Sequence, residues 1–221
     1  MATMTVRLFK KGSDDSSASM CLKSAFEDDP FARAFMPGQV YEDLGAEMYR
    51  KWIDLLQGFG MTYVVECEGV TKTVAAWEPD HEPIWAYPKM LLFLAWCLWK
   101  FGAKQTFRIF KLMSSGDEKR AKHAPTAYRL SVLGTVADFQ GRGAGTKVLK
   151  PMLDRADREN FPCYLESSNP KNVPFYKRNG FKIVEECYPL QDWPEYRESK
   201  GPVMTLMYRD VPPDGETSST N

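Results

Sequence analysis

The chain has 221 residues, a formal net charge of zero and 26% charged residues, an ordinary composition for a globular protein. This balance gives no sign of nucleic acid or an anionic membrane as the main partner. The longest apolar run, residues 90–99, is about half as long as a membrane-spanning helix, and we expect no span. Five scattered cysteines without a CxxC pair indicate small buried side chains in a reducing, cytoplasmic compartment.

The first eighty residues alternate between strand and helix patterns. A strand is predicted at 5–10, and apolar residues at helical spacing follow from 18 to 26. A second helix is predicted at 41–56, and two β-rich runs occupy 61–67 and 72–79. A Glu-Gly turn separates these two runs, so we expect them to form an antiparallel pair.

Residues 84–122 interrupt this alternation. Two helices are predicted at about 88–100 and 103–114, followed by a charged, polar break, "GDEKRAK". The first helix is apolar on nearly every face. We therefore expect it to be buried, to lie at a subunit interface or to touch a membrane.

The strand–helix alternation then resumes. Strands are predicted at 127–136 and 163–168, with a helix at 146–160 between them. Such a unit pairs its strands in parallel with a right-handed crossover. A short helix begins at Asn169-Pro170 or at Asn172, and strands at 181–188 and 203–209 close the chain. The fold class is α+β with a mixed sheet.

Three alternating glycines, Gly141, Gly143 and Gly145, lie between the strand at 127–136 and the following helix. Such a junction points several backbone N–H groups at one spot, where a phosphate or pyrophosphate binds. The alternative is a tight turn without a ligand. The P-loop pattern is absent, and a dinucleotide-binding pattern is weak because Thr146 replaces its third glycine.

Two segments carry a resemblance to a known family. "VADFQGRGAGTKVL" resembles the acyl-CoA pyrophosphate loop of the GCN5-related N-acetyltransferase (GNAT) superfamily, although Ala137 stands where many members have proline. "NPKNVPFYKRNGFKIVE" resembles the superfamily's next segment through Asn169, Tyr176, Gly180 and Phe181. "YLESSNPKNVPFYKRNGF", "AAWEP" and the helical insert are similar to the puromycin N-acetyltransferase-like branch.

The resemblance implies a GNAT fold. Its sheet is mixed and mostly antiparallel, its parallel pair splays to bind acyl-CoA, and helices cover both faces. We expect a single domain at 1–211 with a helical insert at about 84–122, and a disordered tail at 212–221. The implied cofactor-binding residues are Gly134, Thr135, Val136, Gln140, Gly141, Arg142, Gly143, Ala144, Gly145, Thr146, Asn169, Asn172 and Tyr176.

Two residues are candidates for catalysis. The resemblance implies that Tyr176 lies near the thioester sulfur as a general acid, and the alternative is a packing tyrosine. Glu166, near the end of a strand, could deprotonate the acceptor ammonium, or it could make an ordinary ion pair or a hydrogen bond to the loop. His123 is expected to be exposed, and the spacing of histidines and cysteines offers no metal site.

These observations predict an acetyl-CoA-dependent N-acetyltransferase acting on a primary amine of a small molecule, by direct attack in a ternary complex. The alternatives are a protein lysine or N-terminal acetyltransferase and a non-catalytic acyl-CoA-binding module. Either a monomer or a homodimer is expected. The helical insert, with Phe107, would cap the acceptor end together with Trp193 and Tyr196, or it would be additional core.

Overall fold

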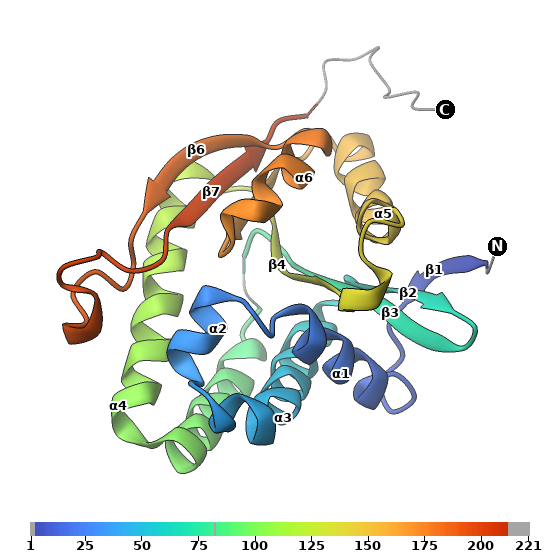
Figure 1. Cartoon of the computed structure of the whole chain (residues 1–221). Coiled ribbons are helices and arrows are strands. Elements are labelled where there is room, and N and C mark those ends of the chain that lie inside the picture. Colours follow the sequence, from blue (N-terminus) through green and yellow to red (C-terminus); the bar gives the residue numbers. More distant parts are fainter. Residues whose placement is uncertain (1–2, 82, 212–221) are drawn as a thin grey trace.

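The computed structural model describes residues 3–81 and 83–211, and this part of the chain contains one seven-stranded sheet (Figure 1). Its strands lie side by side in the order β1-β2-β3-β4-β5-β7-β6. Every neighbouring pair is antiparallel except β4 and β5, which are parallel. The bounds are β1 (Met4–Leu8), β2 (Thr62–Cys67), β3 (Val70–Glu78), β4 (Tyr128–Thr135), β5 (Cys163–Ser167), β6 (Lys182–Cys187) and β7 (Met204–Arg209). The predicted α+β class with a mixed, mostly antiparallel sheet is confirmed.

Helices cover both faces of this sheet (Figure 1). Val74 and Ala76 of β3 share one core with the apolar sides of α1 and α3, whereas Ala75 and Trp77 point to the other face, where α5 packs. The α-helices are α1 (Asp15–Ala25), α2 (Pro30–Phe35), α3 (Gln39–Leu56), α4 (Ala86–His123), α5 (Ala144–Arg158) and α6 (Val173–Arg178). Four short 3-10 turns are η1 (Gln57–Phe59), η2 (Ala137–Phe139), η3 (Pro170–Asn172) and η4 (Pro194–Tyr196). The predicted tail at 212–221 lies outside the described residues.

Helix α2 is not among the predicted elements. Asp29 caps it, because its Oδ1 accepts hydrogen bonds from the backbone N–H groups of Phe31 and Ala32, both at 3.0 Å. Pro30 occupies the first helical position, where its missing N–H costs nothing. The Asp-Pro pair is an ordinary helix-start signal. The helix has six residues, too few for an apolar periodicity to be recognised in the sequence.

The predicted polar break after residue 114 is wrong. Helix α4 bends at Gly102, which has φ 76° and ψ 171°, and then continues to His123. Its charged last turns bind the sheet: Arg120 is buried and donates to Ala127 O at 3.0 Å. His123, expected to be exposed, pairs with Glu185 of β6 at 2.7 Å. These charged side chains form ion pairs and hydrogen bonds with the rest of the protein, so their presence in the sequence does not indicate a loop.

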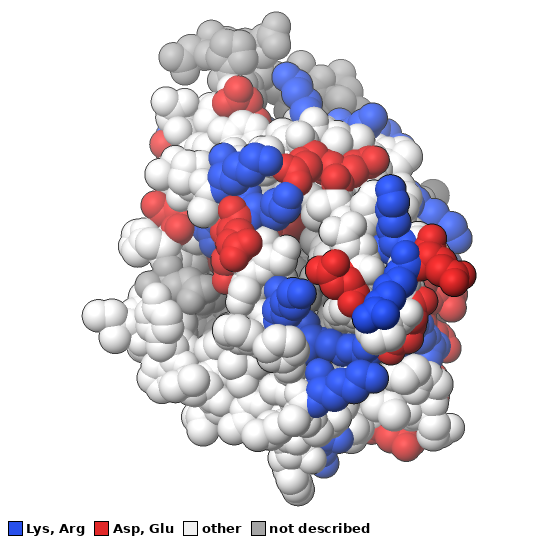
Figure 2. Space-filling model, turned by 90° about the vertical axis from the view of Figure 1, so that its left-hand side faces the viewer, with Lys and Arg blue, Asp and Glu red and all other residues white. Residues whose placement is uncertain are grey.

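The first half of α4 is only partly buried. Phe93 and Cys97 enter a small core, as expected for an apolar helix, but Leu91, Leu92 and Trp99 are exposed. Figure 2 shows the face of the molecule that carries α4: charges of both signs are interspersed over its upper part, and its lower part has few. Within the described residues, no helix is both long and apolar enough to cross a membrane.

Candidate active site

Strands β4 and β5 pair over a short stretch and then part. Their parallel pairing covers only Tyr128 to Leu130 of β4. Beyond this point β4 continues along β3 to Thr135, while β5 follows β7. The register of β3 and β4 shifts here, which leaves Ser131 as the extra residue of a bulge in β4. Because a bulge bends its strand, it gives a physical reason for the predicted opening.

The edge of β4 beyond the bulge offers backbone groups to this opening. Val136 N donates to Lys72 O at 3.0 Å, toward β3. Successive residues of a strand direct their backbone groups to opposite sides, so Gly134 also faces β3 and Thr135 faces the gap. Thr135 O accepts from the side-chain amide of Gln140 at 3.2 Å. Of the predicted cofactor-binding residues 134–136, Val136 therefore directs its N–H to β3, and Thr135 is the one that faces the gap.

The glycine loop forms the N-terminus of α5 at the same end of β4. Gly141 and Gly143 have φ of 75° and 80°, which glycine adopts without strain. A Cβ on either glycine would meet no atom within 4 Å, so the space beside the loop is open. At Gly145 a Cβ would approach the ring of Phe175 to 3.0 Å. Two glycines therefore shape an open loop at the positive end of a helix dipole, and the third lets α5 pack against α6.

Other predicted loop residues surround this helix start. Arg142 donates to Asp138 O at 3.2 Å, and its guanidinium lies 5.0 Å from the centre of the Phe139 ring. Thr146 is exposed in the first turn of α5, and Ala144 is buried beneath it. The backbone N–H groups of a first helical turn have no acceptor inside their own helix. An anion is their natural partner, so a diphosphate site here remains the prediction.

The residues of the second predicted motif have different roles: one caps a helical turn, and two line a cavity. Asn169 Oδ1 accepts from Lys171 N at 3.0 Å and thereby caps η3, so this side chain has a structural role. Asn172 and Tyr176 instead line the cavity described next. Gly180, with φ 88°, follows the end of α6 as predicted.

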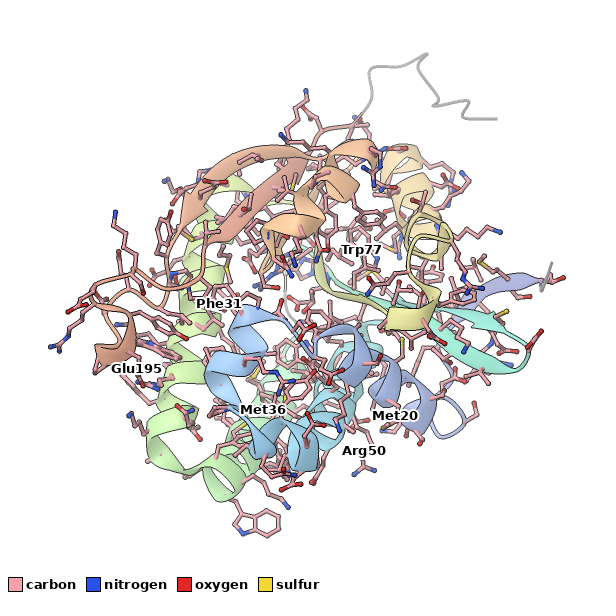
Figure 3. The ribbon with its side chains drawn as sticks, viewed as in Figure 1. Met20, Phe31, Met36, Arg50, Trp77 and Glu195 are labelled. Carbon is pink, nitrogen blue, oxygen red and sulfur yellow. The ribbon has the colours of Figure 1, made fainter. Side chains whose placement is uncertain are left out.

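A cavity of about 260 Å³ lies where β4 and β5 part. Strands β4 and β5 and helices α2, α3, α4 and α6 all contribute to its walls. Phe31 at the beginning of α2 and Met36 directly after its end, both labelled in Figure 3, line it. So do Ser131 of the bulge and the two predicted catalytic residues, Glu166 and Tyr176. The tertiary structure thus brings both candidates to one space.

Tyr176 is buried with its hydroxyl group unengaged. Its ring contacts Phe175 and Phe181 edge-on, at centroid distances of 5.2 and 6.1 Å. The hydroxyl forms no hydrogen bond with another described residue. Burial, and after it the charge of nearby Asp29, raises the pKa of Tyr176 above its ordinary value. The phenol therefore carries its proton at neutral pH and is able to donate it.

Glu166 forms an ion pair, one of the two roles considered for it. Its Oε2 accepts from Arg129 Nη2 at 2.6 Å, and the same guanidinium donates to Asp117 at 3.0 Å. Glu78 lies 3.6 Å from the same Nη1 of Arg129 that pairs with Asp117. The second oxygen, Oε1, is buried and has no hydrogen-bond partner in the described part of the chain. The role of Glu166 as general base stays a prediction.

Asp29 is a cavity residue that the sequence reasoning missed. It is buried, lines the cavity, and its Oδ2 accepts from Ser168 Oγ at 2.5 Å. Burial raises its pKa, against the opposing hydrogen bonds from Ser168, Ala32 and Phe31. The Asp-Pro pair marks it as a helix cap, but no local pattern shows that the loop after α1 reaches the parted strands.

Helix α4 lines the cavity, but not through the residue expected. Phe107 is 66% exposed and is absent from the lining, so its predicted role is wrong. Trp193 and Tyr196 do not line the cavity either. Trp193 lies under Arg108, which donates to Glu195 at 2.8 Å, and the final loop thereby packs on α4 (Figure 3). The α4 residues that line the cavity are Phe93, Phe101, Ile109, Leu112 and Met113.

Comparison with known proteins agrees with this geometry. The Acetyltransferase (GNAT) family model matches residues 114–181, which hold the end of α4, the parted strands, the glycine loop and α6. This match covers less than half of the chain, and it lies over the same strands, loop and helix that form the opening. Among residues 3–81 and 83–211, no group of three or more His, Cys, Asp or Glu could hold a metal ion.

Individual relatives are distant. The chain is 33% identical over 66 residues to the uncharacterized N-acetyltransferase C550.08 of Schizosaccharomyces pombe, covering 30% of this chain and 27% of that protein. It is 31% identical over 72 residues to N-alpha-acetyltransferase 50 of Danio rerio, covering 30% of this chain and 43% of that protein. The structure of a Drosophila melanogaster polyamine N-acetyltransferase is similar with a TM-score of 0.64 at 13% identity, covering 95% of this chain and 100% of that one. At this identity the structural similarity shows the fold alone.

Proposed function

We propose that this chain is an acetyl-CoA-dependent N-acetyltransferase that acetylates a primary amine of a small molecule. One observation carries the proposal: two features lie where strands β4 and β5 part. The open glycine loop follows the end of β4, and a cavity lined by Tyr176 lies between the parted strands. Helix α6 links the two, because Phe175 contacts Gly145 of the loop and the next residue, Tyr176, lines the cavity.

The proposed reaction is a direct attack in a ternary complex. The amine nitrogen bonds to the carbonyl carbon of the thioester while the carbon–sulfur bond breaks. Tyr176 gives its phenolic proton to the departing thiolate. Before the attack, the ammonium loses a proton to a carboxylate or to water. The protein supplies positioning, backbone groups at the parted edge of β4 and the proton donor.

Acetyl-CoA fits the residues around the opening. The positive φ angles of Gly141 and Gly143 and the empty space beside them leave the first N–H groups of α5 accessible to a diphosphate. Thr135 faces the gap where pantetheine would extend along β4. The proposal includes the branch similar to puromycin N-acetyltransferase. Three features support this part: the segment from Tyr164 to Phe181, the "AAWEP" segment and the helical insert. We further propose that residues 1–211 form a single domain.

The test is release of CoA thiol from acetyl-CoA in the presence of small amines, aminonucleosides, lysine peptides and peptides with a free N-terminus. A melting temperature that rises with acetyl-CoA would report binding alone. Turnover with small amines supports the proposal. Turnover only with peptides would favour protein acetylation, to which the similarity to N-alpha-acetyltransferase 50 points. Binding without turnover would leave a non-catalytic acyl-CoA-binding module.

A further inference from the structure

The walls of the cavity are mostly aromatic and aliphatic. Helices α2, α3 and α4 and the loops beside them contribute apolar side chains almost exclusively. They are Phe26, Phe31, Ala32, Phe35, Met36, Met48, Tyr49, Trp52, Phe93, Phe101, Ile109, Leu112 and Met113. The polar residues lie toward the strands and the loop before α2. A molecule bound here would therefore have one polar end and an apolar body.

The cavity has a volume of about 260 Å³. A six-membered ring with a short amine-bearing chain fits this space. A polyamine carries a second cation, which would lose its hydration against the apolar walls.

The polar end contains a carboxylate without a counter-charge. Asp29 is buried, and no Lys, Arg or His within residues 3–81 and 83–211 forms an ion pair with it. Its hydrogen-bond donors are neutral: the backbone N–H groups of Phe31 and Ala32, and Ser168 Oγ. A buried carboxylate without a positive partner is costly, so this site favours a cationic ligand.

Glu166, the other carboxylate of the cavity, has a different environment. Arg129 pairs with its Oε2 at 2.6 Å and shares the same guanidinium with Glu78 and Asp117. An incoming ammonium would compete with a buried guanidinium at Glu166, whereas at Asp29 it meets no other cation. We therefore expect the ammonium group of the acceptor to pair with Asp29 and not with Glu166.

We propose that the acceptor is a small primary amine with an aryl or branched alkyl body, whose ammonium group pairs with Asp29 and whose body lies between α2, α3 and α4. This assignment rests on the proposed function and adds the substrate class and a specificity-determining residue to it. Asp29 binds the cation in the ground state, so its contribution appears in acceptor recognition.

The first experiment uses the wild-type chain with acetyl-CoA and amines that differ in body but not in the reacting group. Phenethylamine and a branched alkylamine are compared with agmatine, spermidine, glucosamine and a short peptide. We expect kcat/KM for the apolar amines to exceed that for the others at least tenfold. Turnover confined to polyamines, sugars or peptides overturns the inference and leaves N-acetyl transfer intact. Absence of acetyl-CoA binding and of turnover with every amine instead refutes the proposed function.

The second experiment tests Asp29 through Asp29→Asn, with Asp28→Asn as the matched control because its neighbour Asp28 is exposed. Asparagine keeps an oxygen for capping α2, so the fold should persist. For phenethylamine, kcat/KM should fall about ten- to a hundredfold in Asp29→Asn. Acetyl-CoA affinity should stay unchanged. The control should match the wild type in both.

A neutral isostere separates charge pairing from packing. Phenethyl alcohol should inhibit the wild type and Asp29→Asn equally, because it lacks the ammonium group. An equal loss of amine and alcohol binding would mean that Asp29 only shapes the cavity, and would overturn its assignment. If Asp29→Asn fails to fold, the wild type decides: it must bind phenethylamine more tightly than phenethyl alcohol in the presence of CoA, and equal binding of the two overturns the charge pairing.

Discussion

Replacing Gly143 with aspartate tests the cofactor loop directly. Gly143 is the N-cap of α5, and a Cβ there would point into open space. The side chain therefore fits without a clash and places a negative charge where the diphosphate of acetyl-CoA is proposed to bind. Its φ of 80° makes any side chain strained, at a cost of about 1–2 kcal/mol. Gly143→Asn carries a similar strain without the charge, which makes it the matched control.

The expected magnitude follows from Coulomb's law. Two unit charges about 5 Å apart repel by roughly 0.8 kcal/mol in a water-like dielectric and by roughly 3.3 kcal/mol at an effective dielectric of 20. At 1.4 kcal/mol for each factor of ten, acetyl-CoA should bind about 4- to 250-fold more weakly to Gly143→Asp than to Gly143→Asn. Because salt screens exposed charges, this difference should shrink as ionic strength rises.

Isothermal titration with acetyl-CoA at two salt concentrations measures both effects. Gly60→Asp serves as a second control, because Gly60 also has a positive φ and open space around its Cβ but belongs to η1 and the start of β2, away from the loop. It should lower stability without changing acetyl-CoA affinity. Equal affinities of folded Gly143→Asp and Gly143→Asn at low salt would show that no phosphate binds at this helix start.

Three further changes test the remaining features. Tyr176→Phe keeps the aromatic packing but removes the phenolic proton donor. In steady-state kinetics kcat should fall about a hundredfold, with little change in acetyl-CoA affinity. Turnover equal to that of the wild type would exclude Tyr176 from the mechanism. Hydrogen bonds from two lysines and a histidine lower the pKa of Glu185 to about 2, so the stability that this carboxylate contributes is present above the ordinary pKa of 4.5 and is lost as pH falls from there to about 2. Glu185→Gln should lower the free energy of unfolding by about 1 kcal/mol at neutral pH and remove the pH dependence over this window in denaturant titrations. A variant with the same acid profile as the wild type would contradict the pairing. Leu112→Ala should change the acceptor KM and leave acetyl-CoA affinity unchanged, whereas Phe107→Ala, at an exposed position, should change neither; the reverse result would place the acceptor elsewhere.

Most elements were predictable because their determinants are local. Apolar spacing located the strands and, apart from the end of α4, the longer helices. The glycines at 141 and 143 indicated the loop before the next helix, where the structure shows positive φ. The hairpin between β2 and β3 followed from one turn, in which Glu68 and Gly69 both have positive φ. The candidate catalytic residues, Tyr176 and Glu166, came from a motif and a strand end, and both line the cavity.

Charged residues show what the sequence by itself could not determine. The segment after residue 114 predicted a solvated loop, whereas Arg120 is buried and Lys119 and Lys122 pair with Glu185 of a distant strand. Sequence composition gives the number of charges but not their partners. The environment of a charge depends on residues far along the chain, which only packing brings within hydrogen-bonding distance.

The same reason separates the two carboxylates of the cavity. Glu166 stood out in the sequence as a possible base, and the fold gives it Arg129 as a partner. Asp29 appeared as no more than a helix cap, and the fold buries it beside the parted strands without a cation. The sequence thus determined the strands, the loop and the family resemblance through local spacing. Tertiary structure decided which of the two cavity carboxylates pairs with an arginine and which has no cationic partner, because these partners lie far along the chain.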